Sequence, residues 1–153
     1  MAAKTNDGGF FYTAAVDTNP AGTSGGGLRS YASMTYAGLK SMIYAGLDKD
    51  DKRIKAAYDW AKKNYDLQQN PGMGQQGLFY YYQTFAKALS VMSVDELEDA
   101  AGKTHRWKEE LVDVLATKQQ QDGSWVNTEN DRWMEGDPNL VTGYILMALA
   151  DCQ

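Results

Sequence analysis

The sequence predicts an all-α protein with its helices in two layers, and two observations lead to this fold class. Charge alternates by segment: the ranges 28–47, 75–92 and 138–150 carry two, one and no charged residues, whereas 50–66 and 103–122 carry nine and eight. Apolar residues recur at three- and four-residue spacing within each range, as in an α-helix. A helix that is apolar nearly all round is buried on both sides, while one with a single apolar stripe faces water. The expected order is therefore inner, outer, inner, outer, inner.

The residues at the segment ends agree with these helices. The Gly-, Thr- and Ser-rich range 16–27 predicts a loop before the first inner helix. Asp48 or Asp50 can cap the first outer helix, because a carboxylate accepts hydrogen bonds from the free N–H groups of a first turn. Asn-Pro-Gly at 70–72 predicts a turn, and Pro138 suits the first turn of the last inner helix.

One further helix is expected between the second inner and second outer helices. Ser93 and Glu96 have the spacing of a capping box, and Gly102 is a suitable stop, so the range predicts a short connecting helix. His105 follows beside Arg106, at the start of a charged segment, and is expected at the surface.

Length and composition limit the functional classes. The 153 residues suit one domain, and the aromatic content argues against disorder. A net charge of −5 disfavours a nucleic-acid partner, and a single cysteine excludes an internal disulfide framework. The range 140–150 is too short to span a membrane. No signal peptide is visible, and the sequence does not indicate a compartment.

An internal repeat underlies the helical pattern. Thr35-Tyr36-Ala37 and Thr84-Phe85-Ala86 occupy equivalent places in inner helices, 49 residues apart. Asp7-Gly8-Gly9-Phe10 is similar to Asp122-Gly123-Ser124-Trp125, and each precedes a loop and an inner helix. A period near 50 residues is typical of stacked helical hairpins. The single domain, 1–153, then divides into repeats at 7–66 and 70–125 and a partial third repeat at 126–153.

The range 119–125, Gln-Gln-Gln-Asp-Gly-Ser-Trp, resembles the QW repeat of terpenoid cyclases and the related prenyltransferase and squalene-oxidase repeat. The resemblance extends over nearly the whole chain. It implies an α/α toroid with inner helices around a central cavity, of which this chain supplies about half of an α6/α6 barrel. In the motif we expect a structural clasp: Gly123 permits the turn, Asp122 accepts from its N–H groups, and Trp125 stacks on Gln119.

Two sets of carboxylates are candidates for catalysis. Asp48, Asp50 and Asp51 have the letters of the aspartate-rich acid motif of squalene-hopene cyclases, which implies a general acid for cyclisation. Neighbouring lysine and arginine side chains lower a carboxylate pKa, however, and helix capping is the better interpretation. A second set lies in the loop before the last helix and would suit a glycan-cleaving toroid that uses two carboxylates; a solvated acidic loop is the alternative. This set is Glu129, Asp131, Glu135 and Asp137.

The sequence predicts no metal and no cofactor. Asp151 and Cys152 are similar to two zinc ligands of protein prenyltransferases, but they are adjacent here, and the one histidine lies upstream. A catalytic zinc site needs three protein ligands.

Aromatic residues predict an apolar cavity on the inner helices. Aromatic faces hold isoprenoid-like ligands and stabilise carbocations, although core packing alone accounts for many of them. The expected cavity residues are Tyr36, Phe79, Tyr80, Tyr82, Gln83 and Tyr144.

These observations favour a repeat domain without a complete catalytic motif that binds an apolar ligand or a partner chain. An active cyclase fragment and a glycan-active enzyme are the alternatives. Because half a ring leaves apolar helices uncovered, we expect either a homodimer that closes the ring or the remainder of a longer chain.

Overall fold

The computed structural model describes residues 7–13, 19–24 and 27–153. Five α-helices dominate this part of the chain: α1 (Ala32–Tyr44), α2 (Lys52–Lys63), α3 (Leu78–Val91), α4 (Trp107–Lys118) and α5 (Pro138–Asp151). There are also two small antiparallel hairpins. One precedes α1 and pairs β1 (Thr23–Ser24) with β2 (Gly27–Leu28), and the other lies between α3 and α4 and pairs β3 (Leu97–Glu98) with β4 (Thr104–His105). The predicted all-α class is confirmed. None of the helices described is long and apolar enough to cross a membrane.

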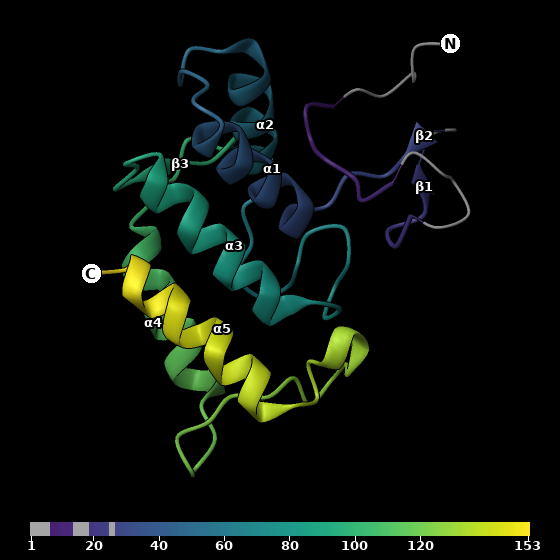
Figure 1. Cartoon of the computed structure of the whole chain (residues 1–153). Helices are drawn as coiled ribbons and strands as arrows, with labels where there is room; N and C mark the ends of the chain where they lie inside the picture. The colour runs from purple at the N-terminus through teal and green to yellow at the C-terminus, as the bar shows by residue number, and fades with distance from the viewer. Residues whose placement is uncertain (1–6, 14–18, 25–26) are drawn as a thin grey trace.

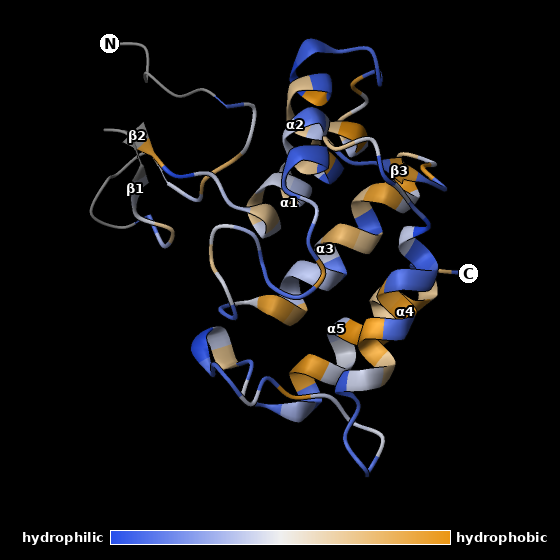
Figure 2. Cartoon of the chain, turned by 180° about the vertical axis from the view of Figure 1, so that it is seen from behind, coloured by the Kyte–Doolittle hydropathy of each residue, from blue (hydrophilic) through white to orange (hydrophobic). Residues whose placement is uncertain are grey.

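The helices lie in two layers (Figure 1). The low-charge helices α1, α3 and α5 lie side by side, and α3 packs against both of the others. The charged helices α2 and α4 lie on the back of this layer, nearer the viewer in Figure 2. Each buries one stripe, centred on Ile54 and Trp60 in α2 and on Trp107 and Leu111 in α4.

The core lies where the two layers meet. Its largest fully buried side chains include Trp107, Tyr36, Tyr81 and Phe85. The ring of Phe85 makes edge contacts with Tyr36 at 5.1 Å and with Trp107 at 5.6 Å between centroids. Such aromatic pairs add stability beyond the area they bury. In Figure 2 the hydrophobic colour is concentrated on α3 and α5.

The expected helix between α3 and α4 is absent, and that prediction was wrong. Residues 97–105 instead form the β3–β4 hairpin, in which Leu97 pairs with His105. Asp99 holds the turn, because its Oδ1 accepts from the backbone N–H groups of Ala101 and Lys103. These local bonds compete with a helix, as aspartate side chains commonly do. The hairpin also buries His105, which is 5% exposed, so its expected surface position was wrong as well.

Two of the low-charge helices, α1 and α3, are capped by side chains from later in the chain. Neither α1 nor α3 has a side-chain cap of its own at its N-terminus. The buried Asn70 accepts from the backbone N–H of Ser33 in α1 at 3.2 Å, and Glu135 accepts from that of Tyr80 in α3 at 2.8 Å. Helix α5 differs, because Asp137 immediately before it caps Asn139. The loop before α3 thus holds the start of α1, and the loop before α5 holds the start of α3.

The corners before α1 and α5 share a second hydrogen bond. The backbone N–H of Phe10 donates to the Thr35 hydroxyl of α1 at 2.9 Å, and that of Trp125 donates to the Thr142 hydroxyl of α5 at 3.1 Å. In both corners an aspartate three residues earlier accepts from the N–H two residues after it: Asp7 from Gly9, and Asp122 from Ser124. The same local geometry therefore occurs twice in the chain.

Candidate functional site

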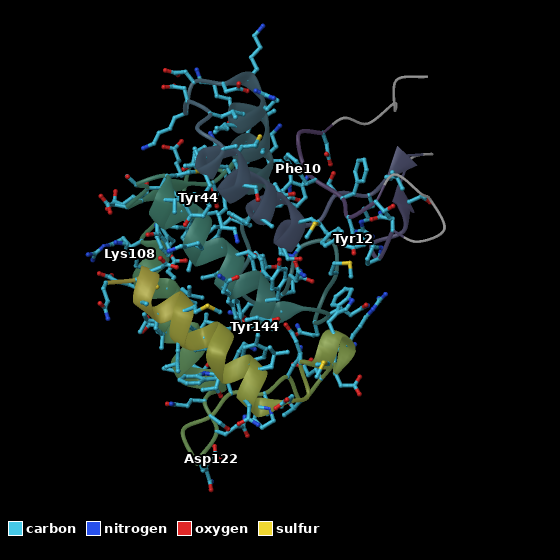
Figure 3. The ribbon with its side chains drawn as sticks, viewed as in Figure 1. Phe10, Tyr12, Tyr44, Lys108, Asp122 and Tyr144 are labelled. Carbon is cyan, nitrogen blue, oxygen red and sulfur yellow. The ribbon has the colours of Figure 1, made fainter. Side chains whose placement is uncertain are left out.

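A pocket of about 490 Å³ lies at the N-terminal ends of α1 and α3. The N-terminal segment, α5 and the loop before α5 complete its walls, and Figure 3 shows Tyr12 and Tyr144 on the two sides of this region. Most lining side chains are aromatic or apolar, with a few polar groups among them, which is the usual composition of a small-molecule site. The lining residues are Tyr12, Pro20, Tyr31, Ser33, Met34, Gly77, Tyr80, Arg132, Trp133, Glu135 and Tyr144.

Glu135 is the one acidic residue in this lining and is 1% exposed. Its Oε1 accepts from the Tyr80 N–H at 2.8 Å, and its Oε2 accepts from the Asn127 side-chain amide at 2.8 Å. Burial raises the pKa of Glu135, and these hydrogen bonds offset only part of that rise. The two caps differ in chemistry: Asn70 at the start of α1 is a neutral amide, whereas Glu135 at the start of α3 is an ionisable carboxyl group.

Three tyrosines form the aromatic wall of the pocket. The rings of Tyr80 and Tyr144 meet edge to face at 5.7 Å and join α3 to α5. Tyr31 precedes α1 and is 4% exposed. Burial, with a smaller contribution from Tyr80 and Tyr12, raises the pKa of Tyr31 to about 12. Burial also raises the pKa values of Tyr80 and Tyr144, so all three phenols are neutral at physiological pH and can act as hydrogen-bonding groups within an apolar wall.

The loop before α5 turns sharply at the pocket. Trp133 and Met134 have φ values of +57° and +65°, the left-handed region that non-glycine residues avoid. Each such residue stores about 1–3 kcal/mol of strain, which persists only where surrounding contacts fix it. The guanidinium of Arg132 lies 4.5 Å from the centre of the Trp133 ring. Arg132 also donates to the side-chain oxygen of Gln76.

The predicted cavity residues separate into two groups. Tyr80 and Tyr144 line the pocket, whereas Gln83 is half-buried on α3 outside it. Tyr36, Phe79 and Tyr82 lie in the core and are at most 3% exposed. A run of aromatics covers most of a helix surface, so the run in α3 supplies both the core and the pocket.

The aspartates before α2 do not line this pocket. The side chain of Asp51 caps α2 and pairs with Arg53 at 2.8 Å, and the Arg53 hydrogen bonds lower its pKa to about 2. Asp50 pairs with Lys55, and this contact lowers the pKa of Asp50. Asp48 accepts from the Asp50 N–H. Asp50 and Asp51 are therefore ionised. All three carboxylates act as hydrogen-bond acceptors or ion-pair partners at the start of a surface helix.

The acidic loop places only one of its four carboxylates in the pocket. Glu135 lines it, whereas Glu129 and Asp131 are exposed and Asp137 caps α5. Hydrolysis of a glycosidic bond by the usual mechanism needs two carboxyl groups on either side of the bond. The described lining supplies one.

The residues of the QW-like motif connect α4 to α5. Gly123 adopts φ +86°, and the Gln119 side chain donates to its carbonyl at 2.9 Å. The indole N–H of Trp125 donates to the Leu115 carbonyl of α4 at 2.8 Å, while its backbone N–H donates to Thr142 of α5. Trp125 is 6% exposed. These contacts therefore hold α4 and α5 together. The motif lies outside the pocket lining.

The residues weighed as metal ligands have other partners. Asp151 pairs with Lys87 at 2.9 Å, and burial raises the pKa of the Cys152 thiol to about 11. His105 lies between Asp99 and Glu110. In the described part of the chain no group of three or more His, Cys, Asp or Glu side chains is placed to hold a metal ion.

Several pocket residues were not foreseen from the sequence: Tyr12, Tyr31, Arg132 and Trp133. One signal was present, because Trp133 and Met134 are large apolar residues in a loop where most neighbours are charged or polar. Tyr31 gave no such signal, since it fits the apolar spacing of its helix.

No family model, no curated protein and no solved structure matches this chain.

Proposed function

We propose that this chain is a squalene-cyclase- and prenyltransferase-like repeat domain, part of an α/α toroid, whose aromatic pocket binds an apolar, isoprenoid-like molecule. The observation that carries the proposal is the pocket itself, in which tyrosines and a tryptophan from five segments surround about 490 Å³. An apolar molecule gains the free energy of leaving water there, and the neutral phenols can orient its polar end.

The repeated corner geometry supports the repeat-domain part of the proposal. The hydrogen bonds of Phe10 to Thr35 and of Trp125 to Thr142 occur at equivalent places, each after a short aspartate-containing turn. The two-layer order of helices is also what a segment of a toroid requires. Toroid closure is part of the proposal.

Binding is favoured over catalysis because each candidate catalytic set is incomplete or misplaced. Asp50 and Asp51 have lowered pKa values, the opposite of what a general acid needs. Glu135 has a raised pKa and faces the pocket, but both its oxygens accept hydrogen bonds that fix the fold.

The experiment is a titration of the protein with farnesol, a neutral isoprenoid alcohol, followed by calorimetry. We expect saturable binding that Tyr144→Ala weakens about tenfold, the loss of one aromatic contact of about 1.4 kcal/mol. Tyr44→Ala is the matched control: Tyr44 is 62% exposed, lies at the far end of α1 (Figure 3) and does not line the pocket. Absence of saturable binding, or equal weakening by both variants, would refute the proposal.

A further inference from the structure

The turn at Trp133 and Met134 is unfavourable in two independent ways. Both residues adopt left-handed backbone angles, where a Cβ atom crowds the following carbonyl. Both also leave large apolar side chains in water, with Trp133 46% and Met134 67% exposed. Glycine or asparagine would satisfy the same backbone without either penalty. The backbone conformation of the turn therefore gives no reason for these two residue types.

The contacts around the turn hold it at the pocket. Immediately after it, Glu135 is anchored by Tyr80 and Asn127, and the backbone N–H of Asn127 donates to the Glu135 carbonyl at 2.9 Å. The Trp133 ring lies so close to Gly77 that a Cβ atom at that glycine would be only 3.0 Å from the ring. The guanidinium of Arg132 lies over the same ring. The indole is thus fixed at the pocket, with its exposed part in solvent.

We infer that the Trp133–Met134 turn is a ligand clamp, in which the indole of Trp133 covers an apolar molecule bound against Tyr31, Tyr80 and Tyr144. This inference rests on the proposed function. The strained backbone directs Trp133 toward the pocket and Glu135 into the start of α3, with Met134 between them. Ligand binding removes the exposed indole surface from water, and this gain offsets the cost of holding a strained, exposed tryptophan at the pocket.

The decisive variants separate backbone strain from the indole. Trp133→Gly relieves the backbone strain at position 133 and deletes the indole. Met134→Gly relieves the backbone strain at position 134 and keeps the indole. For a clamp, both variants keep or raise the melting temperature, Trp133→Gly weakens farnesol binding at least tenfold, and Met134→Gly changes it less than twofold. Trp133→Phe should recover part of the affinity. If Trp133→Gly binds farnesol as the wild type does, the clamp is excluded.

A second measurement uses the wild-type protein alone. Of the four tryptophans, Trp60, Trp107 and Trp125 are at most 6% exposed, so iodide should quench chiefly Trp133. Saturating farnesol should shift the emission to shorter wavelength and protect it from iodide. Bound farnesol with unprotected emission overturns the clamp and leaves the proposed pocket intact. No saturable farnesol binding overturns the proposed function, and the clamp with it.

Discussion

Tyr36 carries a polar atom that the fold does not use. Its side chain is fully buried against Tyr81 and Phe85, and its hydroxyl has no hydrogen-bond partner among the described residues. Burial raises the pKa of Tyr36, so the group is a neutral phenol. Tyr82 in α3 has an equally buried ring, but its hydroxyl donates to the Leu67 carbonyl at 2.7 Å.

These two tyrosines predict opposite effects of the same substitution. Tyr36→Phe should raise the free energy of unfolding by about 1 kcal/mol, because it removes an unsatisfied polar group and keeps the ring. Tyr82→Phe should lower it by about 1 kcal/mol, because it leaves the Leu67 carbonyl without its donor. Urea unfolding followed by circular dichroism measures both. A loss of stability in both variants would show that the Tyr36 hydroxyl has a stabilising contact.

His105 links the β3–β4 hairpin to α4. Its Nδ1 lies 2.9 Å from Glu110 and its Nε2 3.1 Å from Asp99, and both contacts are donated when the ring is an imidazolium. Its ring also stacks on Tyr65 at 4.0 Å, and the Tyr65 hydroxyl donates to Glu110. The His105 hydrogen bond lowers the pKa of Asp99. Burial acts to raise the pKa of Glu110, but hydrogen bonds from His105 and Tyr65 outweigh it and lower that pKa.

This network predicts loss of stability in acid. A carboxyl whose pKa is lower in the folded state adds stability above its unfolded pKa, about 4 here, and loses it as the pH falls through the folded value. The melting temperature should therefore fall between about pH 5 and pH 3. His105→Gln should lower it by a few degrees at pH 7, at about 2–4 °C per kcal/mol, and should flatten the acid limb. Parallel pH profiles for the variant and the wild type would contradict this role.

At the scale of elements, the helices α1 and α3 depend on caps from distant parts of the chain. Asn70 lies fully buried between α1 and the turn that precedes α3, and it accepts from Ser33 while its amide donates to the Gln76 carbonyl at 3.0 Å. A cap of this kind couples two hairpins, because losing it frees the start of one helix and the corner of the next.

Asn70→Ala should therefore lower the free energy of unfolding by about 1–3 kcal/mol, the range for a buried cap whose partners stay unpaired. The neighbouring Gln69→Ala is the control: Gln69 is exposed and its side chain contacts Asp66, so its change should stay within about 0.5 kcal/mol. Thermal unfolding with both variants measures the difference. Equal effects of the two substitutions would argue against coupling through the cap.

The helices were predictable because their signals are local, whereas the site is assembled from distant segments. Charge and spacing placed all five α-helices within a few residues of their observed ends. The hairpin at 97–105 was missed because Asp99 bonds to the turn that follows it, a competing interaction that a capping-box pattern does not reveal. The pocket combines Tyr31, Tyr80 and Trp133 from three segments, and only the fold brings them together.

At the scale of the whole molecule, α5 has the composition of an inner helix and an open flank. Like α3 it is almost free of charge, yet α3 packs between two inner helices, whereas α5 packs mainly against α3. Its outward residues Leu146 and Met147 are 58% and 48% exposed. Exposed apolar surface of this kind is typical of an interface.

The homodimer expected from the sequence stays a prediction, and α5 is the surface on which to test it. Two copies related by a two-fold axis would bury this flank against itself, since the same surface serves both partners. Light scattering should then report about twice the 17.0 kDa chain mass. Leu146→Glu should restore the single-chain mass without changing helicity, because a charge would have to be buried at the contact. Val112→Glu, on the exposed face of α4, should leave the mass unchanged. A wild-type monomer at all concentrations would exclude the dimer, because mass action raises the dimer fraction of a self-associating protein as its concentration rises.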